Sequence, residues 1–215
     1  MDFVWEHRGL ILEGFGRTVQ LALLSGVLSL VFGSILAVMR VCPIPPLRWA
    51  GAAYVNIVRN TPLTLVFVFA VFGLPRLEIR FSFFVFAVIA LTVYTSTFVC
   101  EALRSGMNSV SRGEIEAARS IGLPFSRVLG LIVLPQAFRA VIPLLSNIFI
   151  ALTKNTSIAV AFSVAEATSI MRRLQNQDAR ATFALLFVTA AGYLIITLVL
   201  SYLFSRAERR VAVRP

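Results

Sequence analysis

Charged residues are scarce in this sequence. They make up 14% of the 215 residues, whereas hydrophobic residues make up 58%. A soluble domain usually carries about 25% charged residues. So few charges cannot cover a water-exposed surface, which argues against a soluble, disordered or nucleic-acid-binding protein. The net charge of +10 does not reverse this, because the arginines lie at the edges of apolar runs, where they indicate membrane topology.

Cysteine and histidine are also rare. Cys42 and Cys100 are the only cysteines and His7 is the only histidine. Two distant cysteines give no disulfide framework or metal-ligand spacing, and are best interpreted as small apolar fillers. We therefore expect no metal site and no cofactor on this chain. A cleavable signal peptide is not expected either, because the first long apolar stretch exceeds a signal-peptide core.

The sequence contains several long stretches without charged residues. A transmembrane helix needs about 20 apolar residues. Five stretches qualify if the short second one borrows neighbouring residues and the fourth tolerates Lys154 near its middle. They are residues 18–39, 60–76, 81–103, 140–165 and 181–205. The sequence thus predicts an all-α, polytopic membrane protein with one domain over residues 1–215.

The distribution of arginines predicts the orientation. Five spans place the two ends of the chain on opposite sides of the membrane. With the N-terminus outside, the cytoplasmic segments hold 11 arginines and the outer segments hold 7. Cytoplasmic loops are enriched in basic residues, so we expect the N-terminus outside and the C-terminus inside. After the first span, three prolines should end the helix, and residues 47–58 are interpreted as a short interfacial helix.

The loop over residues 104–139 is expected to lie in the cytoplasm and to contain a short helix. Ser111 suits an N-cap, Gly122 suits the end of the helix, and Pro124 follows it. Residues 134–137 should then turn the chain back toward the membrane. An ordinary amphipathic connector would have the same pattern, so the loop alone does not reveal a function.

Several segments, however, resemble one family. Glu116-Ala117-Ala118, Gly122 and Ile132-x-Leu134-Pro135 match the spacing of the "EAA" signature of ABC importer permeases. Other segments resemble the polar amino acid branch of that family, and in particular the glutamate-uptake permeases of actinobacteria. They are Tyr54-x4-Arg59-Asn60-Thr61-Pro62-Leu63, Cys100-Glu101-Ala102-Leu103-Arg104-Ser105-Gly106, Pro135-Gln136-Ala137-Phe138-Arg139, Lys154-Asn155-Thr156-Ser157 and Glu208-Arg209-Arg210. The resemblance covers about residues 14–212.

The resemblance implies a fold, partners and a location. It implies the type I importer permease fold in the bacterial inner (cytoplasmic) membrane. It also implies a second permease subunit as a heterodimer partner, two ATP-binding subunits and an extracytoplasmic amino-acid-binding protein. This chain has no Walker A motif, so ATP and Mg²⁺ should bind the partner ATPases and the chain should be a non-catalytic transport subunit. The resemblance assigns the loop helix as the coupling helix, with Glu116, Ala117, Ala118 and Gly122 as its contact residues.

Lys154 is the main candidate for the substrate pathway. It is the only lysine, and ionisable residues within the membrane are costly and commonly functional. It could form an ion pair between helices or face the pathway and bind a substrate carboxylate, and the resemblance favours the second role. Asn155, Thr156 and Ser157 could donate hydrogen bonds to the same substrate. We therefore expect an amino acid substrate, with glutamate favoured.

Other polar residues have two interpretations each. Glu101 could bind the α-amino group of a substrate, and its position in the sequence predicts a depth near the cytoplasmic end of its span. Ser96 could line the pathway or serve helix packing. Arg59 and Asn60 could form a gate at the cytoplasmic mouth or anchor the chain at the interface. Glu166 lies at the outer end of a span, where an ion pair with Arg172 or Arg173 is the structural alternative.

Two rival classes have less support from the sequence. A secondary transporter or channel would favour two similar inverted halves, and the five spans show no such repeat. An intramembrane enzyme would need a nucleophile and base or a metal cluster, which a single histidine near the N-terminus and isolated serines do not supply. Co-purification of an ATPase would separate the ABC permease from both rivals.

Overall fold

The structure of the chain is a computed structural model in which residues 2–211 are described. Within that range the regular elements are all helices, which confirms the all-α prediction. The longer ones are α2 (Arg8–Val41), α3 (Pro45–Arg59), α5 (Phe83–Asn108), α9 (Ile142–Asn155), α10 (Ala167–Gln177) and α11 (Thr182–Val211). The shorter ones are α1 (Asp2–Glu6), α4 (Leu63–Val68), η1 (Phe69–Gly73), η2 (Leu74–Leu77), α6 (Arg112–Ser120), α7 (Phe125–Val128), η3 (Leu129–Val133), α8 (Leu134–Ala140), η4 (Thr156–Phe162) and η5 (Ala179–Ala181).

Four helical stretches in the described residues are long and apolar enough to cross a membrane. They are Arg8–Val41, Phe83–Asn108, Ile142–Phe162 and Ala179–Arg210. A further pair, Pro45–Arg59 and Leu63–Leu77, is bent by 106° and makes a fifth span if both arms count as one. The expected span at 60–76 therefore coincides with the second arm, and the expected interfacial helix at 47–58 is the first arm, α3.

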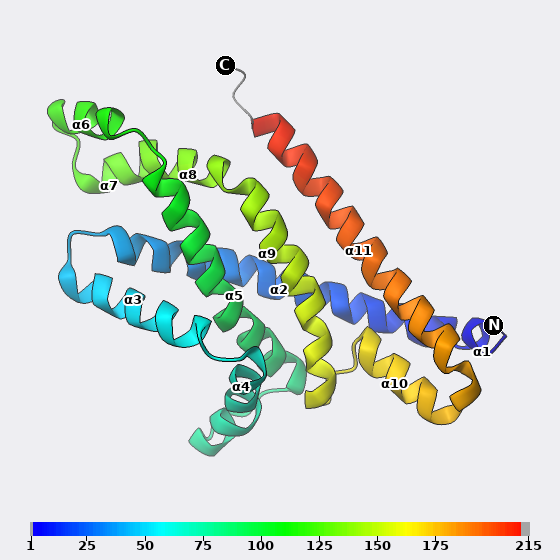
Figure 1. Cartoon of the computed structure of the whole chain (residues 1–215). Coiled ribbons are helices and arrows are strands. Elements are labelled where there is room, and N and C mark those ends of the chain that lie inside the picture. The colour runs from blue at the N-terminus through cyan, green and yellow to red at the C-terminus, as the bar shows by residue number, and fades with distance from the viewer. Residues whose placement is uncertain (1, 212–215) are drawn as a thin grey trace.

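The core forms where α2 crosses α5 (Figure 1). Small residues recur every four positions on the buried face of α2, at Ser25, Ser29, Gly33 and Ala37. At Gly33 a Cβ would lie 2.6 Å from the side chain of Val99. Small residues at this spacing let helix backbones approach closely, which is how membrane helices gain van der Waals contact without a hydrophobic driving force.

The end of α6 confirms the predicted glycine stop. Gly122 has φ +83°, a conformation that glycine adopts without the penalty of a Cβ. Its amide donates to the carbonyl of Arg119 (2.9 Å), and the amide of Leu123 donates to that of Ala118 (3.2 Å). These two bonds form a Schellman motif. The predicted start is also confirmed, because Ser111 occupies the N-cap position, but its side chain makes no capping hydrogen bond.

The predicted turn at residues 134–137 is wrong. The chain continues helically through α7, the π-type turn η3 and α8, and Pro135 lies in the first turn of α8. A proline inside a helix removes a hydrogen bond and clashes with the carbonyl four residues earlier. The wider π-type turn just before it changes that bonding pattern, so the helix continues. The chain bends at Val141 instead (φ −103°).

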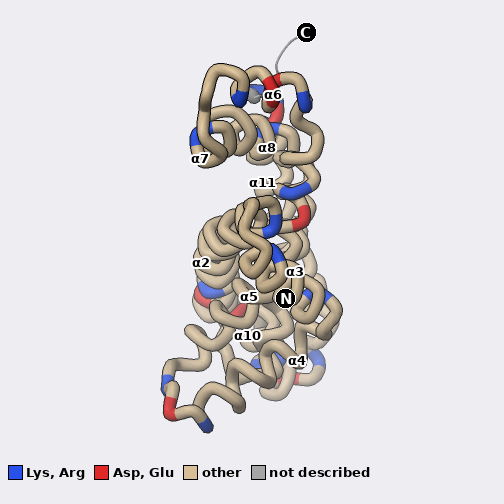
Figure 2. Tube along the Cα trace, turned by 90° about the vertical axis from the view of Figure 1, so that its left-hand side faces the viewer, with Lys and Arg blue, Asp and Glu red and all other residues tan. Residues whose placement is uncertain are grey.

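The two ends of the bundle differ. The helix α6 and the C-terminal end of α11 lie toward one end, and the start of α2 lies at the other (Figure 1). Figure 2 shows that the charged residues are concentrated at helix ends and in connecting segments, while the long helices are mostly uncharged. The region of α6 therefore forms one polar end of an otherwise apolar bundle.

Candidate functional site

A cavity of about 290 Å³ lies between α5 and α9, within the membrane-spanning helices. Its lining residues are Tyr94, Thr95 and Phe98 of α5 and Asn147, Ile148, Ala151, Leu152 and Asn155 of α9. Residues four apart on a helix share a face, so Asn147, Ala151 and Asn155 form a stripe with a small residue between two amides. The cavity is mainly apolar and carries a few hydrogen-bonding groups, which is typical of a site for a small polar ligand.

Arg59 lies next to Phe98, one of the residues that line this cavity. Its guanidinium carbon is 5.6 Å from the centre of the Phe98 ring, a cation–π geometry. The Phe98 ring lies in turn 5.1 Å from that of Tyr94. Asn60, the other expected gate residue, is exposed, and its amide donates to the carbonyl of Asn56 (2.7 Å). The structure thus places Arg59 against a residue that lines the cavity, while the Asn60 side chain bonds to its own helix.

The segment 154–157 lies where the helix changes type. Regular α-helix ends at Asn155 and continues as the 3₁₀ helix η4. Asn155 lines the cavity, Thr156 is buried and donates to Thr153, and Ser157 donates to the carbonyl of Lys154. Lys154 itself is exposed in the last turn of α9 and forms no ion pair with the described residues. The alternative of an ion pair between helices of this chain is therefore not observed.

Glu101 and Ser96 lie apart from this cavity. The Glu101 carboxylate accepts hydrogen bonds from Arg40 of α2 and from Arg104 (2.9 Å to Nη2). It already has two cationic partners, which removes the reason to place a substrate amino group there. The Ser96 hydroxyl donates to the carbonyl of Val93 (2.9 Å) and lies 3.4 Å from the Tyr54 hydroxyl, on the side of α5 that faces α3.

The residues expected to contact an ATPase divide between two faces of α6. Glu116 and Ala117 are exposed, whereas Ala118 is buried. The side-chain amide of Gln136 in α8 donates to the carboxylate of Glu114, which ties α6 to the neighbouring helix. The helix therefore presents Glu116 and Ala117 outward and is held on its other side by Ala118.

Glu166 is fully buried, and its role differs from the expected one. It caps α10, and its carboxylate accepts hydrogen bonds from the amides of Thr168 and Ser169 and the hydroxyl of Tyr193 (each 2.9 Å). The alternative of an ion pair with Arg172 or Arg173 is wrong. Burial raises the pKa of Glu166, and the hydrogen bonds oppose that rise. The signal that sequence reasoning missed is the position of Glu166 just before a helix, because the free amides and the positive end of the helix dipole favour a carboxylate there.

Sequence reasoning also missed Asn147, Tyr94 and Phe98. A search for charges within spans finds Lys154 and passes over neutral amides and aromatics. The signal for Asn147 was its spacing of eight residues from Asn155 in a mainly apolar helix. The two aromatic residues carry no comparable signal, since phenylalanine and tyrosine are common in any membrane span.

Comparison with known proteins identifies the family. Residues 15–213 match the family described as binding-protein-dependent transport system inner membrane component. The glutamate transport system permease protein GluC of Corynebacterium glutamicum is 41% identical over 227 residues, covering 100% of both chains. The probable glutamine ABC transporter permease protein GlnM of Bacillus subtilis is 37% identical, covering 98% of this chain and 97% of that protein.

Solved structures agree with this family. The crystal structure of an amino acid ABC transporter with histidines superposes with a TM-score of 0.87 at 29% identity, covering 98% of this chain and 99% of that one. A methionine ABC transporter, MetNI, in an inward-facing conformation has the same fold at 20% identity, with a TM-score of 0.79 and 97% of this chain covered.

The chain belongs to the family of inner-membrane components of binding-protein-dependent transport systems. It is a multi-pass ABC permease with the type I importer fold, which confirms the resemblance that the EAA-like signature indicated. Its role is that of a transport component that works with a binding protein.

Proposed function

We propose that this chain is the permease of an ATP-driven importer of L-glutamate, and that the cavity between α5 and α9 is its half of the translocation path. The observation that carries the proposal is the character of the cavity. Amides and hydroxyls line it, Arg59 packs against its lining residue Phe98, Lys154 precedes Asn155, and its lining residues include no carboxylate. Such a site favours an anionic substrate, because a cationic side chain would have no charge partner there. The 41% identity to GluC supports the same substrate.

The proposed assembly has partners on each side. A second, different permease completes the path next to the exposed end of α9. Two ATP-binding subunits hold ATP and Mg²⁺ and dock on α6 through Glu116, Ala117, Ala118 and Gly122. An extracytoplasmic binding protein delivers the amino acid. In this arrangement the N-terminus is outside and the C-terminus is inside, as the distribution of arginines favours.

Uptake of labelled glutamate by the reconstituted complex tests this function. Lys154→Met and Arg59→Met should each reduce uptake at low glutamate concentration by roughly tenfold to a hundredfold, because each removes a hydrogen bond to a charged group. Arg172→Met on α10 is the matched control, since it removes an exposed cation distant in sequence from the cavity and should leave uptake unchanged.

Competition identifies the substrate class. Unlabelled glutamate and aspartate should compete better than arginine or histidine. Normal uptake by Lys154→Met, stronger competition by arginine, or uptake without ATP would each contradict the proposal.

A further inference from the structure

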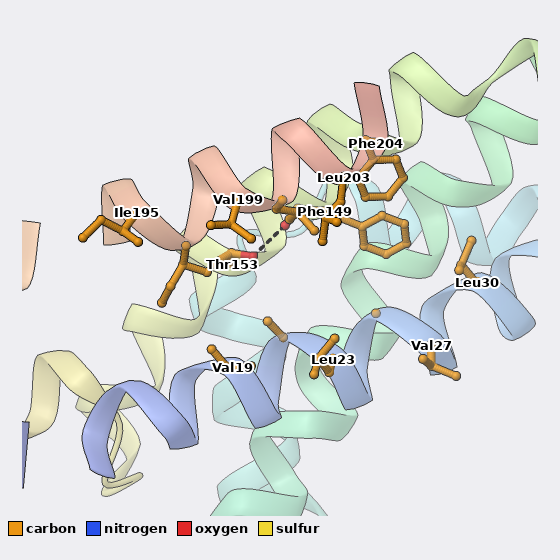
Figure 3. Close-up of a pocket in the computed structure, with 14 residues that line it drawn as sticks. Val19, Leu23, Val27, Leu30, Phe149, Thr153, Ile195, Val199, Leu203 and Phe204 are labelled. Atoms are coloured by element: carbon orange, nitrogen blue, oxygen red, sulfur yellow. Dashed lines mark hydrogen bonds between the residues drawn. The ribbon is translucent and has the colours of Figure 1, made fainter. Parts of the chain in front are cut away.

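An apolar groove runs between α2, α9 and α11, separate from the cavity described above. It has a volume of about 400 Å³. Figure 3 shows Leu23 and Val27 of α2 on one side, Val199 and Leu203 of α11 on the other, and Phe149 of α9 between them. The groove contains one side-chain hydroxyl, that of Thr153, which already donates to the carbonyl of Phe149 (2.9 Å). The groove therefore offers its occupant only apolar contact.

The groove ends beside a basic cluster on the same helix. A second cavity, of about 390 Å³, is lined by Tyr202, Ser205, Arg206, Arg209 and Arg210 near the C-terminal end of α11. Residues 199, 203, 206 and 210 follow the three- and four-residue spacing of a single helix face. Arg206 and Arg210 therefore continue the line of Val199 and Leu203, with Arg206 roughly 4.5 Å further along the helix axis than Leu203.

Nothing in the described residues neutralises this cluster. None of the three arginines forms an ion pair within the described part of the chain, and all are exposed. Glu208 is two positions from both Arg206 and Arg210, so it points to the opposite side of α11. Arg206 packs against the Tyr202 ring, 5.1 Å from its centre. The groove and the cluster together thus offer an apolar slot that leads into a site for an anion.

The groove faces away from the proposed translocation path. Asn147, Ala151 and Asn155 line the α5–α9 cavity, whereas Phe149 and Thr153 line the groove and are two positions out of phase with them. Two positions correspond to about 200° around an α-helix. The next step rests on the proposed function. If the second permease completes the path at the cavity, the groove lies on the side of the molecule that faces the bilayer.

From this combination we infer that the groove and the basic cluster bind one anionic phospholipid of the surrounding membrane. An acyl chain lies along Leu23, Val27 and Val199, and the headgroup phosphate is held by Arg206 and Arg210. In such a lipid the anionic headgroup lies at the end of the apolar acyl chains. In the protein, the basic cluster likewise lies at the end of the apolar groove. Basic pockets beside membrane helices on the cytoplasmic side are typical sites for anionic headgroups.

Lipid titration of the assembled transporter tests the inference. The purified complex is stripped of lipid and titrated with phosphatidylglycerol or phosphatidylcholine while bound lipid is counted by native mass spectrometry. Wild type should bind one phosphatidylglycerol tightly per copy of this chain. The double variant Arg206→Gln, Arg210→Gln should bind it about thirtyfold more weakly, at roughly fivefold for each arginine near the membrane surface. Equal affinity of wild type and double variant, or no preference over phosphatidylcholine, would overturn the inference.

A matched control and a cross-linking probe identify the occupant. Arg172→Gln, Arg173→Gln removes the same charge from α10 and should leave phosphatidylglycerol binding unchanged. A photoreactive benzoylphenylalanine at position 199 should label phospholipid, whereas labelling of the second permease would show a protein in the groove and refute the inference. Lipid binding is read without transport, so failure of glutamate uptake alone would contradict only the proposed function.

Discussion

Glu166 shows how much one buried carboxylate can organise. Its oxygens receive hydrogen bonds from two amides of α10 and from Tyr193 of α11, and the hydroxyl of Thr18 in α2 lies 3.5 Å away. Three helices therefore meet at one side chain. The free amides at the start of α10 and the positive end of its dipole stabilise the negative charge.

Replacing Glu166 with alanine should destabilise the assembled transporter. The change removes the cap of α10 and leaves the half-buried Tyr193 hydroxyl with only the Thr168 hydroxyl, 3.2 Å away, as a partner, a combined loss of about 2–4 kcal/mol. Thermal unfolding in detergent measures this loss. Arg173→Ala, an exposed change on the same helix, is the control and should stay within about 0.5 kcal/mol of wild type. Equal effects of the two changes would contradict the role of Glu166.

The raised pKa of Glu166 gives stability a defined pH dependence. A carboxyl group whose pKa is higher in the folded state binds its proton more tightly there. Its contribution to stability is therefore fully present below the ordinary pKa of glutamate and is lost as pH rises through the raised value. Glu166→Gln should flatten this part of the stability profile, and Glu13→Gln, an exposed change on α2, should not. A profile that keeps its slope in Glu166→Gln would assign the effect to another group.

At the scale of elements, α6 depends on the conformation of Gly122. A valine at φ +83° would be strained by roughly 1–2 kcal/mol and would open the Schellman motif. We predict that Gly122→Val abolishes substrate-stimulated ATP hydrolysis while the permease still inserts. Gly113→Ala in the same helix is the control, because its added Cβ meets only the Ser111 hydroxyl at an ordinary 3.6 Å. Normal ATPase stimulation in reconstituted Gly122→Val would show that docking does not depend on this bend.

The close contact between α5 and α8 is equally testable. A Cβ at Gly106 would lie 2.6 Å from Val141 and 2.7 Å from the carbonyl of Ala137. Gly106→Val should therefore force the two helices apart and lower stability by about 1–3 kcal/mol or more. Gly130→Ala, where nothing lies within 4 Å of the added atom, is the control. A thermal unfolding curve of Gly106→Val that matches wild type would contradict the packing described.

The elements also show what a sequence can and cannot predict. The membrane spans can be predicted because the bilayer requires long apolar helices. The end of α6 at Gly122 can be predicted because a left-handed bend strongly favours glycine. The contact between Glu101 and Arg40 cannot be predicted from the sequence, because Arg40 lies 61 positions away and meets Glu101 only where α2 crosses α5. The cavity was missed for a similar reason, because it depends on which faces of α5 and α9 meet.

For the whole molecule, the proposed orientation can be tested by labelling in intact cells. Cysteines introduced at Arg80 and at Ser126 lie in exposed segments, while the native Cys42 and Cys100 are buried and should give little background. A membrane-impermeant thiol reagent should label Arg80→Cys from outside and reach Ser126→Cys only after the cells are opened. The reverse pattern would invert the orientation.

At Gly106 the backbone of α5 lies so near α8 that there is no free space between the two helices. A displacement of α8 must therefore displace α5, because close-packed interiors transmit strain rather than absorb it. The α6 helix is tied to α8 through Gln136 and Glu114, and α5 carries Tyr94, Thr95 and Phe98 along the cavity. A push on α6 would thus act through a short linkage, and the shape of the cavity would change with the position of α6, even though α6 lies in a loop and the cavity lies among the membrane-spanning helices.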